Sequence, residues 1–190
     1  AAVGPGSKVL DVATGTGDLA IEAASRGAEV VGSDFSEKML ERARAKAPHI
    51  RFEQADALAL PYPDDAFDAA TVGFGARNFA DLERGLAEMA RVVRPGGRVV
   101  VLEITQPTRP PLSTFFSLWF DRLVPLAGRL AGDPDAYTYL PSSVKRFPGP
   151  RELAAEMERA GLGELRWILT GGGIIALHAG TVLPARPAEA

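Results

Sequence analysis

The sequence "VLDVATGTGD", residues 9–18, joins an apolar run to two glycines and then to an acid. The apolar run at residues 8–12 predicts a short buried strand, and residues 18–26 have the apolar spacing of a helix. Gly15 and Gly17 lie between them, and glycine permits a positive φ and a close approach of a ligand to the backbone. Because a helix N-terminus presents free N–H groups and a partial positive charge, this turn predicts a binding site for an anionic group.

The alternation of apolar runs and helical periods continues along the chain. Further strands are predicted at residues 29–32, 50–54, 67–73 and 98–104, with helices after Ser36, after Asp81 and from Gly149-Pro150 onward. Five strands alternating with helices predict a doubly wound, mostly parallel α/β sheet. Residues 164–169 and 174–179 predict two more strands, and the link at 170–173 is too short for a parallel crossover, so this pair is expected to be antiparallel.

We expect a single domain over residues 1–183, with a proline-punctuated insertion at about 106–149 and a flexible tail at 184–190. The formal charge of −3 gives no general attraction to nucleic acid, so no nucleic-acid partner is expected. The absence of cysteine excludes disulfides, thiol catalysis and thiolate metal sites, and no His/Asp/Glu grouping has metal-ligand spacing. No run is long and apolar enough to span a bilayer, and a cytoplasmic location is expected.

Three aspartates bear on the ligand of the glycine turn. Asp34 ends the second predicted strand, where a carboxylate can accept both hydroxyls of a ribose, although it could also cap the next helix. Asp56 follows the third strand, where it can meet an adenine amino group or simply form a solvated turn. Asp18 follows the turn itself, where its charge repels a diphosphate but pairs with the ammonium of a zwitterionic amino acid. This pattern favours S-adenosylmethionine (SAM) over NAD.

An oxidoreductase remains the alternative at this point, since residues 15–20 also fit the G-x-G-x-x-G/A dinucleotide pattern. A module that binds the cofactor as a sensor, without catalysis, is a third interpretation.

The chain resembles class I SAM-dependent methyltransferases through Asp11-Val12-Ala13-Thr14-Gly15-Thr16-Gly17, Asp34, Asp56-Ala57 and Arg94-Pro95-Gly96-Gly97, in that order. More narrowly, it resembles the ubiquinone/menaquinone biosynthesis C-methyltransferase family. That resemblance extends from about Val9 to Gly180 and rests on "FGARNFADLERGLAEMARVVRPGGRVVVLEIT", "AYTYLPSSVKRFPGPREL" and "LTGGGIIALHAG".

The resemblance implies a seven-stranded sheet whose last two strands form an antiparallel edge. It also implies SAM as the cofactor, with S-adenosylhomocysteine as the product. The expected cofactor-binding residues are Asp11, Thr14, Gly15, Thr16, Gly17, Asp34, Phe35, Asp56, Ala57 and Gly73.

There are departures from the family pattern. Ala13 stands where many class I enzymes have a glycine, and Gly73 stands where family members often have a serine. The family's N-terminal segment, which helps to enclose the substrate, is not in this sequence, so we expect cofactor binding to survive better than methylation.

The implied reaction is C-methylation of a reduced polyprenyl quinone precursor, either a demethylmenaquinol or a ubiquinol precursor. Another apolar small molecule is the alternative acceptor. Methylation of a ring carbon needs a group that stabilises a phenolate and one that removes the ring proton. We expect Arg77, just past the fourth strand, to stabilise the phenolate or to hold a water that acts as base; the alternative is a surface ion pair with Asp81 or Glu83. His178 is a candidate base through its near-neutral pKa, although its place in the last strand favours a structural role.

The insertion is expected to contact the substrate. Its aromatic cluster fits a wall or lid for an apolar quinol and a peripheral contact with the membrane, or an extra helix packed on the sheet. The expected substrate-binding residues are Phe116, Trp119, Tyr137, Tyr139 and Arg146.

Overall fold

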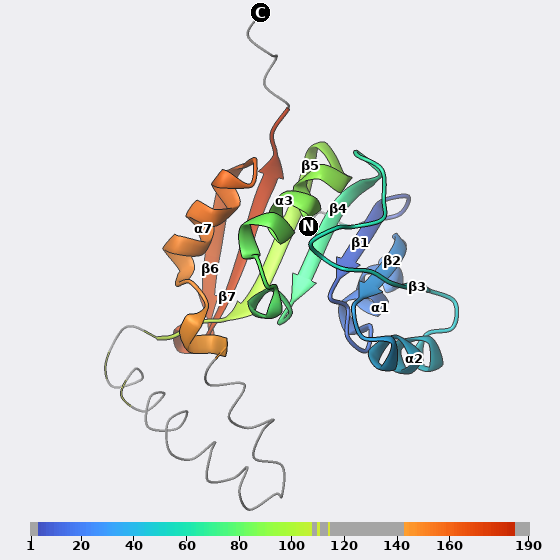
Figure 1. Cartoon of the computed structure of the whole chain (residues 1–190), viewed down its shortest axis with the longest axis horizontal. Coiled ribbons are helices and arrows are strands. Elements are labelled where there is room, and N and C mark those ends of the chain that lie inside the picture. Colours follow the sequence, from blue (N-terminus) through green and yellow to red (C-terminus); the bar gives the residue numbers. More distant parts are fainter. Residues whose placement is uncertain (1–3, 108–109, 111–113, 115–142, 185–190) are drawn as a thin grey trace, which may run out of the picture.

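A computed structural model of the 190-residue chain describes residues 4–107, 110, 114 and 143–184 (Figure 1). In chain order the elements are β1 (Lys8–Val12), α1 (Asp18–Ser25), β2 (Glu29–Asp34), α2 (Glu37–Lys46), β3 (Arg51–Gln54), β4 (Phe67–Gly73), η1 (Ala76–Asn78), α3 (Leu82–Val92), β5 (Val93–Ile104), α7 (Pro150–Arg159), β6 (Leu162–Thr170), η3 (Gly171–Gly173) and β7 (Ile175–Val182). Most of the predicted insertion and nearly all of the predicted tail lie outside the described residues.

The seven strands form one sheet in the order β3-β2-β1-β4-β5-β7-β6. Strands β1 to β5 pair in parallel, and β7 is antiparallel to both of its neighbours, β5 and β6. The predicted mostly parallel sheet with an antiparallel C-terminal pair is therefore confirmed, with β6 as the outer strand. The strand order reverses between β1 and β4, and ligands of such sheets bind in the crevice at the carboxyl ends of the strands there.

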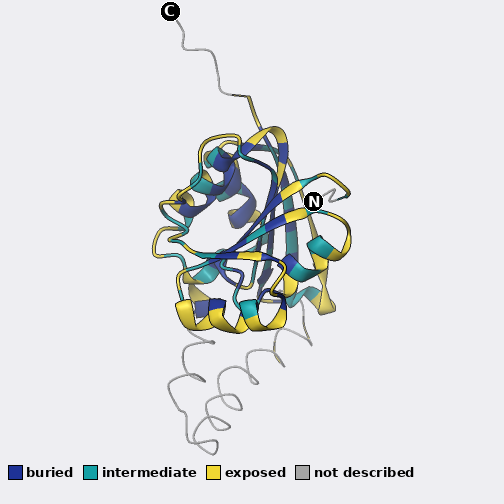
Figure 2. Ribbon diagram, turned by 90° about the vertical axis from the view of Figure 1, so that its right-hand side faces the viewer, coloured by how far each residue is buried: buried dark blue, intermediate teal, exposed yellow. Residues whose placement is uncertain are grey.

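Two layers of helices cover the sheet, and each layer closes its own hydrophobic core (Figure 2). One core joins β1, β4 and β5 to α3 and α7; its fully buried members include Leu86, Met89, Leu153 and Met157. The other joins β1, β2 and β3 to α1 and α2. Figure 1 shows that α1 and α2 lie at the β1–β3 end of the sheet, whereas α3 and α7 lie toward the other end.

The helix ends follow the predicted capping chemistry with one difference. Asp81 accepts a hydrogen bond from the Arg84 backbone N–H at 3.0 Å, as an N-cap should. Pro150 begins α7 directly after Gly149. Ser36 occupies the N-cap position of α2, but its side chain makes no capping bond.

The boundary between α3 and β5 differs from the predicted start of this strand at residue 98. The helix ends at Val92, and the strand begins at Val93, before Pro95-Gly96-Gly97. The reason is that Val93 pairs with Phe67 across a register shift, so the proline and glycines form an irregularity inside the strand. Within the described ranges, no helix has both the length and the apolar character needed to span a bilayer.

The packing of α3 gives a stability prediction. Leu86 is 0% exposed, so Leu86→Ala should lower the free energy of unfolding by about 2–5 kcal/mol through lost burial and a cavity. Leu183 is 50% exposed, and Leu183→Ala is the matched control, expected to cost less than about 1 kcal/mol. Urea unfolding of both variants measures the difference, and equal losses would contradict this assignment of the core.

Candidate active site

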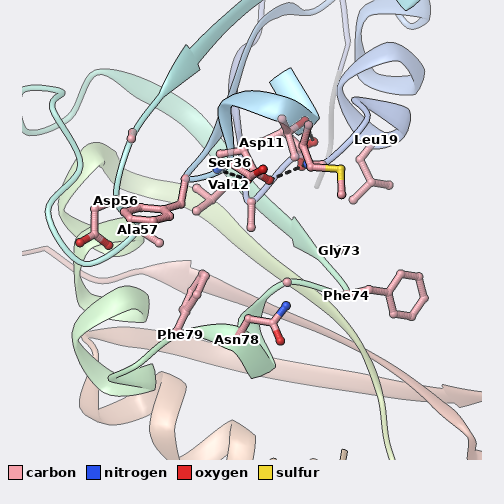
Figure 3. A pocket seen from close by; sticks show the side chains of 18 of the residues that line it. Asp11, Val12, Leu19, Ser36, Asp56, Ala57, Gly73, Phe74, Asn78 and Phe79 are labelled. Atoms are coloured by element: carbon pink, nitrogen blue, oxygen red, sulfur yellow. Dashed lines mark hydrogen bonds between the residues drawn. The ribbon is translucent and has the colours of Figure 1, made fainter. Parts of the chain in front are cut away.

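A pocket of about 970 Å³ opens at the carboxyl ends of β1, β2, β4 and β5 (Figure 3). It lies at the point where the strand order reverses, as the fold predicts. Its lining residues are Asp11, Val12, Ala13, Thr14, Gly15, Thr16, Asp18, Leu19, Asp34, Phe35, Ser36, Met39, Ala55, Asp56, Ala57, Leu58, Gly73, Phe74, Gly75, Asn78, Phe79, Ala80 and Leu102.

Hydrogen bonds fix the glycine turn between β1 and α1. The Thr14 backbone N–H donates to the Ser33 carbonyl at 2.9 Å, and the Gly15 N–H donates to the Asp34 carboxylate at 2.8 Å. Gly15 and Gly17 have φ of +56° and +85°, the left-handed conformation that glycine adopts without steric cost. The turn is thus attached to the end of β2 as well as to β1.

Ala13 also takes the left-handed conformation, with φ of +51°, which is uncommon for a residue with a side chain. A Cβ atom placed on Gly75 would lie 2.6 Å from the Ala13 Cβ. The methyl group of Ala13 is therefore accommodated because residue 75 is glycine.

Asp11 is the buried carboxylate of the pocket, with only 1% of its surface exposed. It accepts hydrogen bonds from the Thr14 hydroxyl at 2.6 Å and from the Thr71 hydroxyl at 2.7 Å. Burial outweighs these bonds and raises the pKa of Asp11 from 3.8 to about 6. A positively charged ligand group would stabilise the ionised form of this carboxylate.

Asp18 differs from its expected role. Its side chain is largely exposed and forms an ion pair with Lys46, and it accepts a hydrogen bond from the Thr16 hydroxyl at 2.9 Å. The bond from Lys46 is the main reason that the pKa of Asp18 is lowered. Asp18 lines the pocket, but it is exposed and forms an ion pair at the surface. Asp11 is therefore the carboxylate of the site that is removed from water.

The carboxylate of Asp34 joins the glycine turn to the start of α2. One carboxylate oxygen accepts from Gly15 N–H and the other accepts from Ser36 N–H, each at 2.8 Å. The second bond satisfies the N–H of Ser36, the N-cap residue of α2, whose own side chain makes no capping bond. Asp34 nevertheless lines the pocket, and each carboxylate oxygen can accept a further bond.

Asp56 lies at the far end of the pocket in Figure 3. It is exposed, and its Oδ1 accepts from the Leu58 N–H at 2.9 Å within a turn.

Nine of the expected cofactor-binding residues line one cavity: Asp11, Thr14, Gly15, Thr16, Asp34, Phe35, Asp56, Ala57 and Gly73. Phe35 is 75% exposed at its rim. Gly17 does not line the cavity; it caps α1 and closes the turn by donating to the Thr14 carbonyl at 2.9 Å.

Arg77 does not line this pocket and is not at the surface. Its guanidinium donates to the Glu103 carboxylate at 2.8 Å, and its backbone N–H donates to the same side chain at 3.2 Å. The arginine side chain is 12% exposed and that of Glu103 only 1%. The alternative of a surface pair with Asp81 or Glu83 is therefore wrong, because the arginine partner is a buried acid in β5.

His178 is also buried, with 1% of its surface exposed, and lies outside this pocket. Its Nε2 is 2.8 Å from the Pro150 carbonyl, and its ring stacks on Trp167 with centroids 5.8 Å apart. Because a carbonyl only accepts, Nε2 carries the proton and Nδ1 is left as a lone pair. Burial lowers the pKa of His178, so the ring is neutral near pH 7.

The structure leaves most of the expected substrate contacts undescribed. Phe116, Trp119, Tyr137 and Tyr139 lie outside the described residues. Arg146 is described and exposed, and it does not line this pocket.

Several lining residues were not foreseen from the sequence. These are Leu19, Asn78, Phe79 and Leu102, of which Leu19 lies at the end opposite Asp56 in Figure 3. Leu102 could have been found, since it lies near the carboxyl end of a parallel strand at the switch point. Glu103 also carried a signal, because a lone acid in an apolar strand requires a buried partner.

The charges of the pocket decide its ligand class. Asp11, Asp18, Asp34 and Asp56 line it, and no lysine, arginine or histidine does so among the residues that the structure describes. A diphosphate would meet these carboxylates without a cationic partner, which is unfavourable. A ligand with a cationic centre and ribose hydroxyls suits the same groups.

Comparisons with known proteins agree with this geometry. A model of the ubiE/COQ5 methyltransferase family matches residues 1–182. Demethylmenaquinone methyltransferase of Thermus thermophilus is 49% identical over 180 residues, covering 91% of this chain and 81% of that protein. The protein of that name from Deinococcus radiodurans is 52% identical over 172 residues, covering 87% and 71%. A crystal structure of a SAM-dependent methyltransferase from Aquifex aeolicus has the same fold, with a TM-score of 0.70 at 16% identity, covering 96% of this chain and 85% of that one.

The raised pKa of Asp11 predicts a pH dependence of stability. Between about pH 4 and 6 the folded protein binds more protons at Asp11 than the unfolded chain does, so this group lowers the free energy of unfolding as pH rises. Asp11→Asn removes the titration. The variant should therefore gain stability over wild type by roughly 2–3 kcal/mol across this interval, measured by urea unfolding at several pH values.

Asp65→Asn is the control for the same chemical change at an exposed aspartate, and it should show no such gain. A stability difference between Asp11→Asn and wild type that does not change from pH 4 to 6 would refute the assignment.

Proposed function

Because the chain belongs to the ubiE/COQ5 methyltransferase family, we propose that it transfers a methyl group from SAM to a ring carbon of a demethylmenaquinol. The observation that carries the proposal is the glycine turn beside a pocket that is lined by four aspartates and by no cationic side chain among the described residues. The identity with demethylmenaquinone methyltransferases supports the naphthoquinol over a ubiquinol precursor. Nothing in this pocket favours the NAD-dependent alternative.

The lining residues fit SAM group by group. Asp34 has free lone pairs for ribose hydroxyls at the end of β2, and Asp56 is placed for an adenine amino group. Asp11 supplies a desolvated negative charge for the cationic part of the ligand. The free N–H groups at the start of α1, beside Gly15 and Thr16, suit the carboxylate of the methionyl group. When bound, the cofactor supplies an activated methyl group.

The protein's part in such a reaction is to align the acceptor ring and to keep water away from it. The end of the pocket opposite Asp56 is apolar, with Leu19 and Phe74 there. An apolar ring would pack there with the acidic end left for the cofactor.

We propose that Arg77 stabilises the phenolate of the acceptor. Its Nε is buried and has no hydrogen-bond partner among the described residues, although its guanidinium is tied to Glu103. Because Arg77 does not line the pocket, this buried donor would act on the phenolate through a bound water. His178 stays the other candidate for the base: its Nδ1 lone pair has no partner among the described residues, and it too lies outside the lining of the pocket.

We also propose that the protein works at the cytoplasmic face of a membrane, because quinols with long apolar chains reside there. The test of the function is a methyl-transfer assay with full-length protein, SAM and a reduced demethylnaphthoquinol. Formation of the C-methylated quinol, identified by mass spectrometry, is the expected result. Cofactor binding without turnover of any quinol would favour a sensor instead.

Asp34→Ala should weaken binding of S-adenosylhomocysteine by about 1–3 kcal/mol, through loss of charge-assisted hydrogen bonds and of the bond that holds Gly15. Isothermal titration calorimetry measures the affinity. Glu41→Ala, which removes an exposed acid from α2, is the control and should bind as wild type does. If Asp34→Ala binds as tightly as the control, the carboxylate is not part of the cofactor site.

A further inference from the structure

One face of the sheet carries an apolar surface that no described helix covers. Among the described residues, the core closed by α1 and α2 contains no residue of β5, β6 or β7, whereas α3 and α7 pack on the opposite face. Leu102, Leu177 and Ile168 are direct cross-strand partners there, so their side chains stand side by side on this face. We call these three residues the apolar row.

The apolar row begins at the proposed active site. Leu102 lines the pocket, and so does Gly73, its partner in the neighbouring parallel strand. Leu19 lies over Gly73, since a Cβ atom there would be 2.5 Å from the Leu19 Cδ1. The other end of the row is the edge strand, where Ile168 is 63% exposed. With strands about 4.8 Å apart, the row runs roughly 10 Å from the pocket to the edge of the sheet.

The side chains in the row on one side of the apolar row are uncharged. Ile104 and Ile175 are cross-strand partners in the next row, and Thr170 completes that row on β6. In the described strands, the row on the other side carries a charged side chain, Arg166, opposite Ala179. Among the described strand residues, an apolar ligand leaving the pocket along Leu102 would therefore follow uncharged side chains from β5 to β6.

The two ends of the pocket differ in polarity, and this difference decides at which end an apolar chain leaves it. Asp56 lies at one end in Figure 3, and Leu19 and Phe74 lie at the other. The acidic end suits the adenosyl part of the cofactor, so an apolar chain attached to the acceptor ring must leave at the opposite end. That end is where Leu102 connects the pocket to the apolar row.

We infer that the apolar row of Leu102, Leu177 and Ile168 binds the isoprenoid chain of the quinol substrate. This inference rests on the proposed function, which supplies an acceptor made of a ring and an apolar chain. Removal of the chain from water against these side chains is favourable in proportion to the apolar area buried. The row thereby selects acceptors that carry a chain over acceptors that carry the ring alone.

The test compares two substitutions on the same edge strand. Ile168→Glu places a charge in the row, and Leu169→Glu places the same charge on the opposite face, at a side chain of similar exposure, 53% against 63%. Each variant is assayed with SAM and two acceptors, a polyprenyl demethylnaphthoquinol and the same ring without a chain. Ile168→Glu should lower kcat/KM for the polyprenyl acceptor by about tenfold or more and leave the chainless acceptor within about twofold. Leu169→Glu should not discriminate between the two acceptors.

Equal losses on both acceptors, or the same discrimination in Leu169→Glu, would overturn the inference. A second measurement does not depend on turnover: a polyprenyl naphthoquinone with a diazirine on its chain is photo-crosslinked to the protein, and the labelled peptides are identified. Labels within residues 166–178 support the row, and labels confined to other segments reject it. If wild type is labelled there but methylates no quinol, the proposed function fails and the apolar-chain site stands.

The same variants separate other occupants of the face. If Ile168→Glu abolishes a self-association of the wild-type protein in analytical ultracentrifugation, a second copy covers the row. If it abolishes sedimentation with phosphatidylglycerol vesicles that contain no quinol, the row contacts lipid. Either result, without discrimination between the two acceptors, replaces the inference.

Discussion

The carboxylate of Asp34 holds together the three segments on which the pocket depends. It accepts one N–H from Gly15 in the turn after β1 and one from Ser36 at the start of α2, while its own backbone ends β2. Charge-assisted bonds to backbone N–H groups are among the stronger hydrogen bonds of proteins. The glycine turn is thereby fixed relative to the end of the neighbouring strand, and the groups proposed to bind the cofactor are positioned before any ligand arrives.

Burial of the Asp11 carboxylate has a free-energy cost for the folded protein. The side chain lies near the end of a core strand, where two threonine hydroxyls and the Ala20 backbone N–H are its partners and no lysine or arginine is within its described contacts. Its raised pKa means that the ionised form is disfavoured by the folded protein alone. A cationic ligand would remove part of that free-energy penalty. The unfavourable burial of this carboxylate in the free protein would therefore favour ligands that carry a positive charge.

The sequence was sufficient for the regular parts of the fold. The strand–glycine–helix pattern at residues 8–26, the cap at Asp81 and the short link before β7 all follow from local chemistry, and each is found in the structure. The errors lie where contacts are distant in sequence. The pairing of Val93 with Phe67 extends β5 past a proline, and Arg77 finds a partner 26 residues away in Glu103 rather than a nearby surface acid. The ion pair of Asp18 with Lys46 was not foreseen from the sequence, because it depends on how α1 and α2 pack.

The meeting of Ala13 and Gly75 limits how this part of the protein can change over evolutionary time. A methyl group at position 13 is tolerated only while position 75 lacks one, because the two β-carbons would otherwise overlap. A mutational path that enlarges residue 75 must therefore first pass through glycine at residue 13, so the order of the two steps matters. Through this single steric contact, whether a substitution at position 13 or 75 is tolerated depends on the residue at the other position, a relation called sign epistasis.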